Sequence, residues 1–195
     1  MQVGDTSFKA SSNPISCTKR SKKTPMPTNI EIKAICKNPD HIKSILENHQ
    51  ADFKGVDHQI DNYFNVPAGR LKLREGNIEN SLIFYKRPNQ AGPKKSEVEL
   101  YVLPAGTNLK QVLNAAIGTK VVVDKQRAIY FIDNVKFHID TVQNLGSFIE
   151  IEAIDTDGSI SEAELLEQCE HYLKLFNISE ADLLEESYSD MLLRK

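Results

Sequence analysis

Three short stretches of this chain alternate between apolar and polar or charged residues, and this alternation limits the possible folds more than any other feature. The stretches are residues 29–33, 96–102 and 148–154. A period of two is typical of β-strands that have one apolar and one polar face. A half-solvated sheet would explain any single strand of this kind, but acids recur at this spacing on several strands and bases on others. If these faces converge, they line an interior with acids and bases.

Length and charge set the first limits on function. The 195 residues suffice for one domain with a buried core. With 24 Lys and Arg against 27 Asp and Glu, the net charge of −3 argues against a nucleic-acid partner and against a polybasic membrane-binding surface. No apolar run approaches the ~20 residues that cross a bilayer. The 3 cysteines are odd in number and far apart, which fits a reducing compartment, so we expect a cytoplasmic protein.

The first 28 residues differ in composition from the rest of the chain. They are rich in Ser, Thr, Lys and Pro and lack the apolar stretch of a secretory signal. This composition predicts a disordered N-terminal tail, followed by one domain over residues 29–195.

The remaining pattern predicts mainly antiparallel strands with a few helices. We expect helices over 39–48, 107–117 and 161–176, and a final helix that begins near Ser179. The predicted strands are 29–36, 59–65, 70–75, 81–87, 97–102, 120–127, 128–132, 135–140 and 148–154. Such a chain is typical of a barrel or a strongly curved sheet.

The charged positions that share a strand parity form an acidic and a basic set. The acids are Glu31, Glu97, Glu99, Asp140, Glu150 and Glu152, and the bases are Lys33, Arg70, Lys72, Arg74, Lys86, Lys125, Arg127 and Lys136. Two carboxylates ~4 Å apart repel each other by about 4 kcal/mol at an effective dielectric near 20, so facing acids require a cation. Oxygen ligands without cysteine favour Mg²⁺ or Mn²⁺, and arginine pairs well with phosphate. The residues alone therefore predict a metal-dependent phosphate-binding pocket.

Other catalytic templates are missing from the sequence. There is no Gly-x-x-x-x-Gly-Lys-Ser/Thr loop, no Gly-x-Gly-x-x-Gly and no Gly-x-Ser-x-Gly. Among the histidines, only His138 lies between charged residues of one strand face, Lys136 and Asp140. For His138, a structural and a catalytic role remain equally open.

Several motifs in order along the chain resemble the CYTH superfamily of triphosphate tunnel metalloenzymes, which includes class IV adenylyl cyclases and thiamine triphosphatases. The motifs are Asn29-Ile-Glu31-Ile-Lys33, Gln59-x-Asp61-x-Tyr63-Phe64, Arg70-Leu-Lys72-Leu-Arg74, Tyr85-Lys86-Arg87-Pro88, Lys125-x-Arg127, Asp140 with the run Leu145 to Glu152, and Ser187 to Leu192. Asn29 stands where the hallmark Glu-x-Glu-x-Lys has its first glutamate. A similar substitution occurs in the class IV cyclase-like branch, so the resemblance points to that branch.

The resemblance implies an α+β fold, mainly antiparallel β, in which an eight-stranded closed barrel with peripheral helices forms a tunnel. It implies that Glu31, Asp140, Glu150 and Glu152 hold Mg²⁺ or Mn²⁺, that Lys33, Arg70, Lys72, Arg74, Lys86, Lys125 and Arg127 bind the phosphates, and that Lys33, Arg74, Lys86 and Asp140 are catalytic. The expected reaction converts ATP to cyclic AMP and pyrophosphate. Hydrolysis of thiamine triphosphate or inorganic triphosphate is the alternative, and a non-catalytic nucleotide- or polyphosphate-binding module is a third reading.

Overall fold

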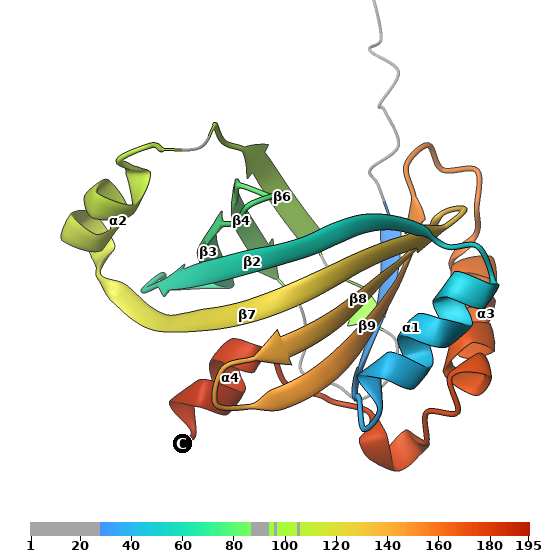
Figure 1. Ribbon diagram of the computed structural model, residues 1–195. Helices are drawn as coiled ribbons and strands as arrows, with labels where there is room; N and C mark the ends of the chain where they lie inside the picture. The colour runs from blue at the N-terminus through green and yellow to red at the C-terminus, as the bar shows by residue number, and fades with distance from the viewer. Residues whose placement is uncertain (1–27, 87–93, 96, 105) are drawn as a thin grey trace, which may run out of the picture.

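Nine antiparallel strands form one strongly curved sheet with helices around it (Figure 1). The computed structural model describes residues 28–86, 94–95, 97–104 and 106–195. The strands are β1 (Thr28–Ile35), β2 (Asp52–Phe64), β3 (Arg70–Glu75), β4 (Ser81–Lys86), β5 (Lys94–Lys95), β6 (Glu97–Val102), β7 (Thr119–Ile132), β8 (Val135–Val142) and β9 (Gly146–Asp155). The helices are α1 (Pro39–Asn48), α2 (Leu109–Ile117), α3 (Glu162–Leu175), the 3-10 helix η1 (Glu180–Asp182) and α4 (Tyr188–Leu193). Of the predicted tail, residues 1–27 lie outside the described residues.

The prediction of a closed eight-stranded barrel is wrong in one respect: the strands do not close into a complete barrel. The strand order is β5-β1-β9-β8-β7-β2-β3-β4-β6, and β5 and β6 at its two ends are not paired with each other in the described part of the chain. The reason is that the short β5 pairs with β1 whereas β6 pairs with β4. Only one residue separates Lys95 from Glu97, so their Cα atoms lie within about 7.6 Å of each other. The curled sheet is therefore an open barrel whose two edges are joined by the chain.

Most predicted elements are confirmed, with three corrections. Strand β2 begins seven residues earlier than predicted, at Asp52, and passes a register shift at Gly55, whose φ of +118° suits glycine. Residues 119–132 form one long strand, not two. The final helix predicted from Ser179 is only the short η1, because the next residues join β1: Leu183 bridges to Ala34, and the Leu184 amide donates to the Lys33 carbonyl. None of the helices in the described ranges is long and apolar enough to cross a membrane.

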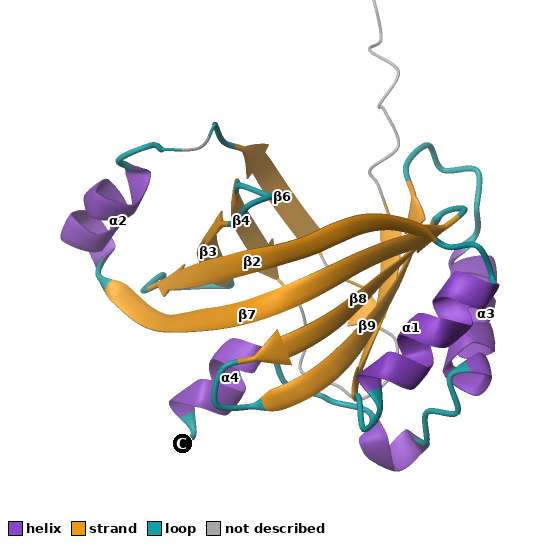
Figure 2. Cartoon of the chain, viewed as in Figure 1, coloured by secondary structure: helices purple, strands orange, loops and turns teal. Residues whose placement is uncertain are grey.

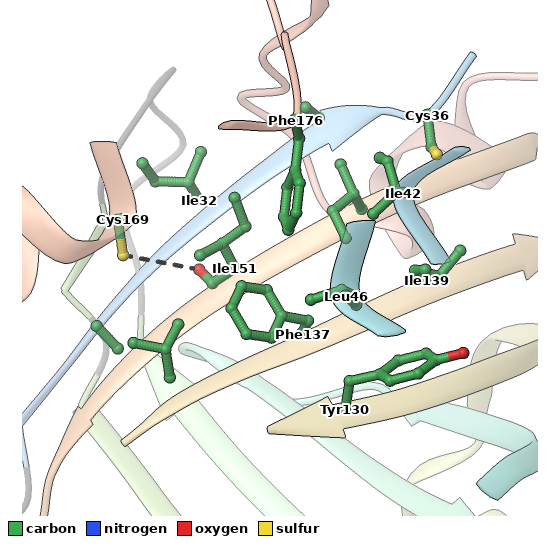
Figure 3. Close-up of a cluster of buried hydrophobic side chains, with 14 of the residues drawn as sticks. Ile32, Cys36, Ile42, Leu46, Tyr130, Phe137, Ile139, Ile151, Cys169 and Phe176 are labelled. Carbon is green, nitrogen blue, oxygen red and sulfur yellow. Dashed lines mark hydrogen bonds between the residues drawn. The ribbon is translucent and has the colours of Figure 1, made fainter. Parts of the chain in front are cut away.

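The main apolar core lies outside the sheet. Helices α1 and α3 cover the outer face of the strands β1, β9 and β8 (Figure 2). The alternate residues that face them are fully buried, among them Ile32, Phe137 and Ile151, and Leu46 of α1 packs onto the same cluster (Figure 3). The Cys169 thiol of α3 also lies here and donates to the Ile30 and Ile151 carbonyls. Because this face takes the apolar side chains, the charged ones face the inside of the curled sheet.

Candidate active site

The inner face of the sheet carries charged side chains that are almost completely buried. In an antiparallel pair, residues directly opposite each other have side chains on the same face. Lys33 of β1 opposes Glu150 of β9, which opposes His138 of β8, and Arg127 of β7 opposes Asp140 of β8. Lys33, Arg127 and Asp140 are 4%, 3% and 0% exposed. Burial of so many charges requires each to be paired, and they form two groups around single carboxylates.

Glu150 is the centre of the first group. Its Oε1 lies 2.7 Å from Lys33 Nζ, and its Oε2 lies 2.8 Å from Arg127 Nη2 and 3.1 Å from His138 Nδ1. Burial alone would raise the pKa of Glu150, but Arg127 and Lys33 outweigh it and hold the pKa well below its usual value. Burial, together with the charge of Arg127, lowers the pKa of His138 to about 3. A neutral His138 therefore donates from Nδ1 to the ionised Glu150.

Asp140 forms a two-point ion pair beside this group. Arg127 donates from Nε to Oδ1 over 2.7 Å and from Nη2 to Oδ2 over 2.5 Å, and the Tyr188 hydroxyl donates to Oδ2 over 2.9 Å. Tyr188 comes from α4, and its ring centre lies 3.9 Å from Lys33 Nζ. The structure thus uses both oxygens of Asp140 to orient Arg127 and to tie α4 to the interior, which was not part of the sequence prediction.

Asp61 of β2 is the centre of the second group, which we call the Asp61 group: Asp61, Arg74, Lys72 and Lys125. Arg74 donates to both carboxylate oxygens over 2.8 and 3.1 Å, and Lys125 Nζ and Lys72 Nζ lie 3.0 and 3.2 Å from Oδ2. Burial would raise the pKa of Asp61, but the three cations hold it well below its usual value. Three cations therefore share the single carboxylate of Asp61, so the Asp61 group carries an excess of positive charge.

Burial and neighbouring cations both act on the two lysines of the Asp61 group. Burial, and next the nearby guanidinium of Arg74, lowers the pKa of Lys72 to about 7. Burial and the charge of Arg127 lower the pKa of Lys125 to about 8. Glu79, from the turn before β4, is a second acid here, since it contacts Arg74 over 2.8 Å and Lys136 over 2.7 Å. An anion placed among these cations would therefore be strongly attracted.

Glu31 and Glu152 oppose each other across β1 and β9 and form the acidic end of the interior. Burial, and next the charge of Glu31, raises the pKa of Glu152, although Asn29 donates to its Oε1 over 2.6 Å. A divalent cation would relieve this repulsion. Within the described ranges no three His, Cys, Asp or Glu side chains gather closely enough to hold a metal. Because Mg²⁺ is usually held by one or two carboxylates together with substrate phosphates, the Glu31–Glu152 pair fits such an ion.

The structure brings most, but not all, of the sequence-derived residues together. Lys33, Lys72, Arg74, Lys125, Arg127, Asp140 and Glu150 are all in the two groups described above. Arg70 also lies on the inner face and donates to Asp190 of α4 over 2.7 Å. Lys86 is exposed, because it follows Tyr85 on β4 and alternation directs its side chain to the opposite face. Glu99, opposite Phe84, is likewise exposed on the outer face.

Three interior residues were missing from the sequence-derived site. Asp61 has the parity of Gln59 and Tyr63, so the motif around it could have indicated its position. Glu79 lies in a turn, where parity gives no direction, and is placed by its amide, which donates to Asp57 over 3.0 Å. Tyr188 lies on a helix distant in sequence, and only the tertiary structure shows its contact with Asp140.

Comparisons with known proteins bear on the fold and the family of this chain. A protein of Methanocaldococcus jannaschii named "Putative adenylate cyclase" is 28% identical over 83% of this chain and 98% of its own length. The solved structure of a "putative adenylate cyclase" from Vibrio parahaemolyticus is 19% identical, covers 87% of this chain and 99% of its own, and gives a TM-score of 0.70. A Hippeastrum protein, described as a "putative adenylyl cyclase" with a dominant triphosphatase activity, is 14% identical over 85% of this chain and 94% of its own, with a TM-score of 0.54. The CYTH domain model matches residues 27–188, and the chain therefore belongs to the CYTH domain family.

Proposed function

We propose that this protein is a divalent-metal-dependent enzyme that acts on triphosphates. The reaction we favour is the conversion of ATP to cyclic AMP and pyrophosphate. The observation that carries the proposal is the Asp61 group, in which Arg74, Lys72 and Lys125 share one buried carboxylate. A triphosphate brings several negative charges, which would complete the pairing of these cations.

The pairing of each cation with a carboxylate fixes its position before substrate binds. Asp61 orients Arg74 through two hydrogen bonds, Glu150 holds Lys33, and Asp140 holds Arg127. Such preorganised cations stabilise charge that develops on transferring phosphate oxygens without further rearrangement. They would bind the phosphate chain, orient the phosphorus under attack and stabilise the departing pyrophosphate.

Glu31 and Glu152 would hold Mg²⁺ or Mn²⁺ next to these cations. The bound ion would supply Lewis-acid polarisation of phosphate oxygens and a template for in-line attack. The attacking group would be the ribose 3′ hydroxyl in a cyclase and a water molecule in a hydrolase, and the same residues would serve both reactions.

Hydrolysis of a triphosphate is the second candidate. It is favoured by the Hippeastrum protein, since a protein of this fold that is described as a cyclase has a dominant triphosphatase activity. The name of the M. jannaschii relative favours cyclisation. Fold and shared site residues do not separate the two reactions, so the products decide.

The test is to incubate the purified protein with Mg²⁺ or Mn²⁺ and, separately, ATP, thiamine triphosphate and inorganic tripolyphosphate, and to separate the products by chromatography. Cyclic AMP with pyrophosphate is the expected result. Orthophosphate without cyclic AMP would identify a hydrolase. Binding without any product, seen as a rise in Tm with triphosphate and metal, would contradict an enzymatic role and favour a binding module.

Matched variants connect the activity to the interior. Glu152→Gln should abolish metal-dependent turnover, whereas Glu99→Gln on the exposed outer face should leave it unchanged. Lys72→Gln should weaken triphosphate binding at least tenfold, and Lys86→Gln should not, because Lys86 is exposed. Loss of triphosphate binding in Lys86→Gln would instead place Lys86 at the phosphate site.

A further inference from the structure

One wall of the open barrel is apolar, and it continues directly from the phosphate-binding wall. Three rows cross the strands β3, β4 and β6, and each begins at a cation and ends at an apolar residue. The rows are Arg70–Tyr85–Val98, Lys72–Ile83–Leu100 and Arg74–Ser81–Val102. Since opposed residues share a face, the β6 residues lie on the same inner face as Lys72, whose ammonium contacts Asp61.

This apolar wall is exposed, unlike the rest of the inner face. Val98, Leu100 and Val102 are 43%, 57% and 72% exposed, whereas Ile83 beside them on β4 is 8% exposed. Three consecutive inward positions of one strand thus present apolar side chains that the described residues leave largely uncovered. We call Val98, Leu100 and Val102 the β6 wall.

We propose that the β6 wall binds the flat, ring-containing organic group of a triphosphate whose phosphates lie at the Asp61 group. This inference rests on the proposed function, because it takes the Asp61 group to bind the phosphates. It adds the location at which the organic half of the substrate binds, a half that inorganic tripolyphosphate lacks.

The spacing between the two walls suits such a molecule. Neighbouring strands lie about 4.8 Å apart, so β6 lies about 10 Å from β3 along the sheet. Lys72 and Leu100 stand in the same row, so a ligand that contacts both would lie straight across the strands. A molecule with a charged and an apolar end matches this surface, whereas inorganic tripolyphosphate would leave the β6 wall in water.

The tyrosine in these rows supports a ring ligand. Tyr85 lies between Arg70 and Val98, and it is 8% exposed. Lys72 Nζ lies 5.9 Å and Arg70 Cζ 5.8 Å from the Tyr85 ring centre. Tyr85 therefore separates Arg70 from Val98, and an aromatic group that packs against Val98 or Leu100 would extend this apolar surface.

A matched pair of variants on one strand tests the inference. Leu100→Thr shortens a side chain of the β6 wall, and Tyr101→Thr does so on the outer face of the same strand, where Tyr101 is 67% exposed. Both retain a residue with good β-propensity. Affinities for ATP, thiamine triphosphate and inorganic tripolyphosphate are measured by calorimetry without divalent metal, so that the metal-dependent reaction does not proceed.

We expect Leu100→Thr to weaken the binding of ATP or thiamine triphosphate about tenfold, which corresponds to about 1.4 kcal/mol, and to leave tripolyphosphate binding unchanged. Tyr101→Thr should change neither. An equal loss for tripolyphosphate, or no loss for either organic triphosphate, would overturn the inference while the phosphate site stands. Failure of the unmodified protein to bind tripolyphosphate would instead remove the phosphate site itself.

A second copy of the chain is the other occupant to test, because β6 is an edge strand. Sedimentation of the unmodified protein and of Leu100→Thr separates the two cases. A monomer in both supports a ligand surface. A dimer that Leu100→Thr dissociates, with unchanged ATP affinity, would assign the β6 wall to self-association.

Discussion

The two faces of the sheet are both largely buried, but they are buried by different means. On the outer face, Ile32, Phe137 and Ile151 pack against the helices α1 and α3 in an apolar core. On the inner face, Lys33, Arg127 and Asp140 are also buried, and ion pairs hold their charges there. The strands β1, β8 and β9 contribute to both faces through simple alternation.

This difference separates stability from function. Apolar burial stabilises the fold by about 25 cal/mol for each Å² removed from water, whereas buried ion pairs are weak evidence for stability because desolvation offsets their attraction. The outer face therefore accounts for most of the folding free energy. The inner face keeps charges that a stable sheet does not need, which is the pattern expected of a binding site.

The largest effect is expected from the outer face. Phe137 is fully buried, and its ring lies edge-on to Tyr172 and Phe176, with centroid distances of 4.7 and 5.7 Å. Phe137→Ala should lower the free energy of unfolding by about 4 kcal/mol, measured by urea denaturation. The affinity of the folded variant for tripolyphosphate should stay unchanged. Phe53→Ala, at a residue 50% exposed, is the control and should cost less than about 1 kcal/mol.

Removal of a charge from the inner face should destabilise the protein somewhat less than Phe137→Ala. Unlike Phe137→Ala, it should also change how the protein responds to ligand. Asp61→Asn leaves three buried cations without their shared carboxylate and should cost about 3 kcal/mol. Tripolyphosphate should restore part of this loss and stabilise the variant more than the unmodified protein. Asp124→Asn, in a partly exposed pair with His58, should cost less than about 1 kcal/mol. Equal stabilisation of Asp61→Asn and the unmodified protein by tripolyphosphate would contradict an anion site here.

Strand parity explains how much of both faces could be predicted. Alternation within residues 29–33 and 148–154 assigned Glu31, Lys33, Glu150 and Glu152 to one face, and the structure confirms that they share it. Two of the predicted helices begin at capping residues that can be read in the sequence: the Asn38 side chain accepts from the His41 amide, and Ser161 and Glu164 form a capping box. These are local signals, so the sequence alone contains them.

The rest depends on contacts distant in sequence. The Asp61 group needs the register of β2 with both β3 and β7, which places Arg74 and Lys125 near one carboxylate. The strand that carries Lys86 was predicted over 81–87, but its sequence has no alternation of charge that would show which face Lys86 takes. The prediction of a closed barrel failed for a related reason, since β5 pairs with one edge and β6 with the other, and no local pattern shows such a division.

The inner face should also give stability an unusual pH dependence. Burial lowers the pKa of Lys72 from 10.5 to about 7. Below pH 7 Lys72 is charged in both the folded and the unfolded protein, and the folded protein bears the full cost of burying that charge. Between pH 7 and 10.5 the unfolded chain binds more protons, so this cost disappears as pH rises.

Lys72→Met removes the titration and tests this dependence. The free energy of unfolding of the variant relative to the unmodified protein should be highest at pH 6. It should fall by at least about 1.4 kcal/mol, the equivalent of one pKa unit, by pH 10. Lys86→Met, at the exposed position on β4, should show no such trend. A constant difference for Lys72→Met would mean that Asp61 fully compensates the charge of Lys72.

The smallest effect is expected at the acidic end of the interior. Burial and Glu31 raise the pKa of Glu152, so ionisation of this carboxyl is less favourable in the folded state than in the unfolded one. Below the pKa that Glu152 has in the unfolded chain, this carboxyl is protonated in both the folded and the unfolded protein, and no stability is lost. Above its raised pKa in the folded protein, the folded state bears the full cost of the buried negative charge. Glu152→Gln keeps an acceptor for Asn29 and should raise Tm at pH 7 by at most about 2–4 °C, the equivalent of 1 kcal/mol for a domain of this size.

This gain in Tm should vanish near pH 4. Mg²⁺ should raise the Tm of the unmodified protein more than that of the variant, because the ion relieves a repulsion that the variant lacks. If Glu152→Gln destabilises the protein at pH 7, the Asn29 contact outweighs the repulsion between the two glutamates. The Glu31–Glu152 pair would then belong with the ion-paired interior and would no longer indicate a cation site.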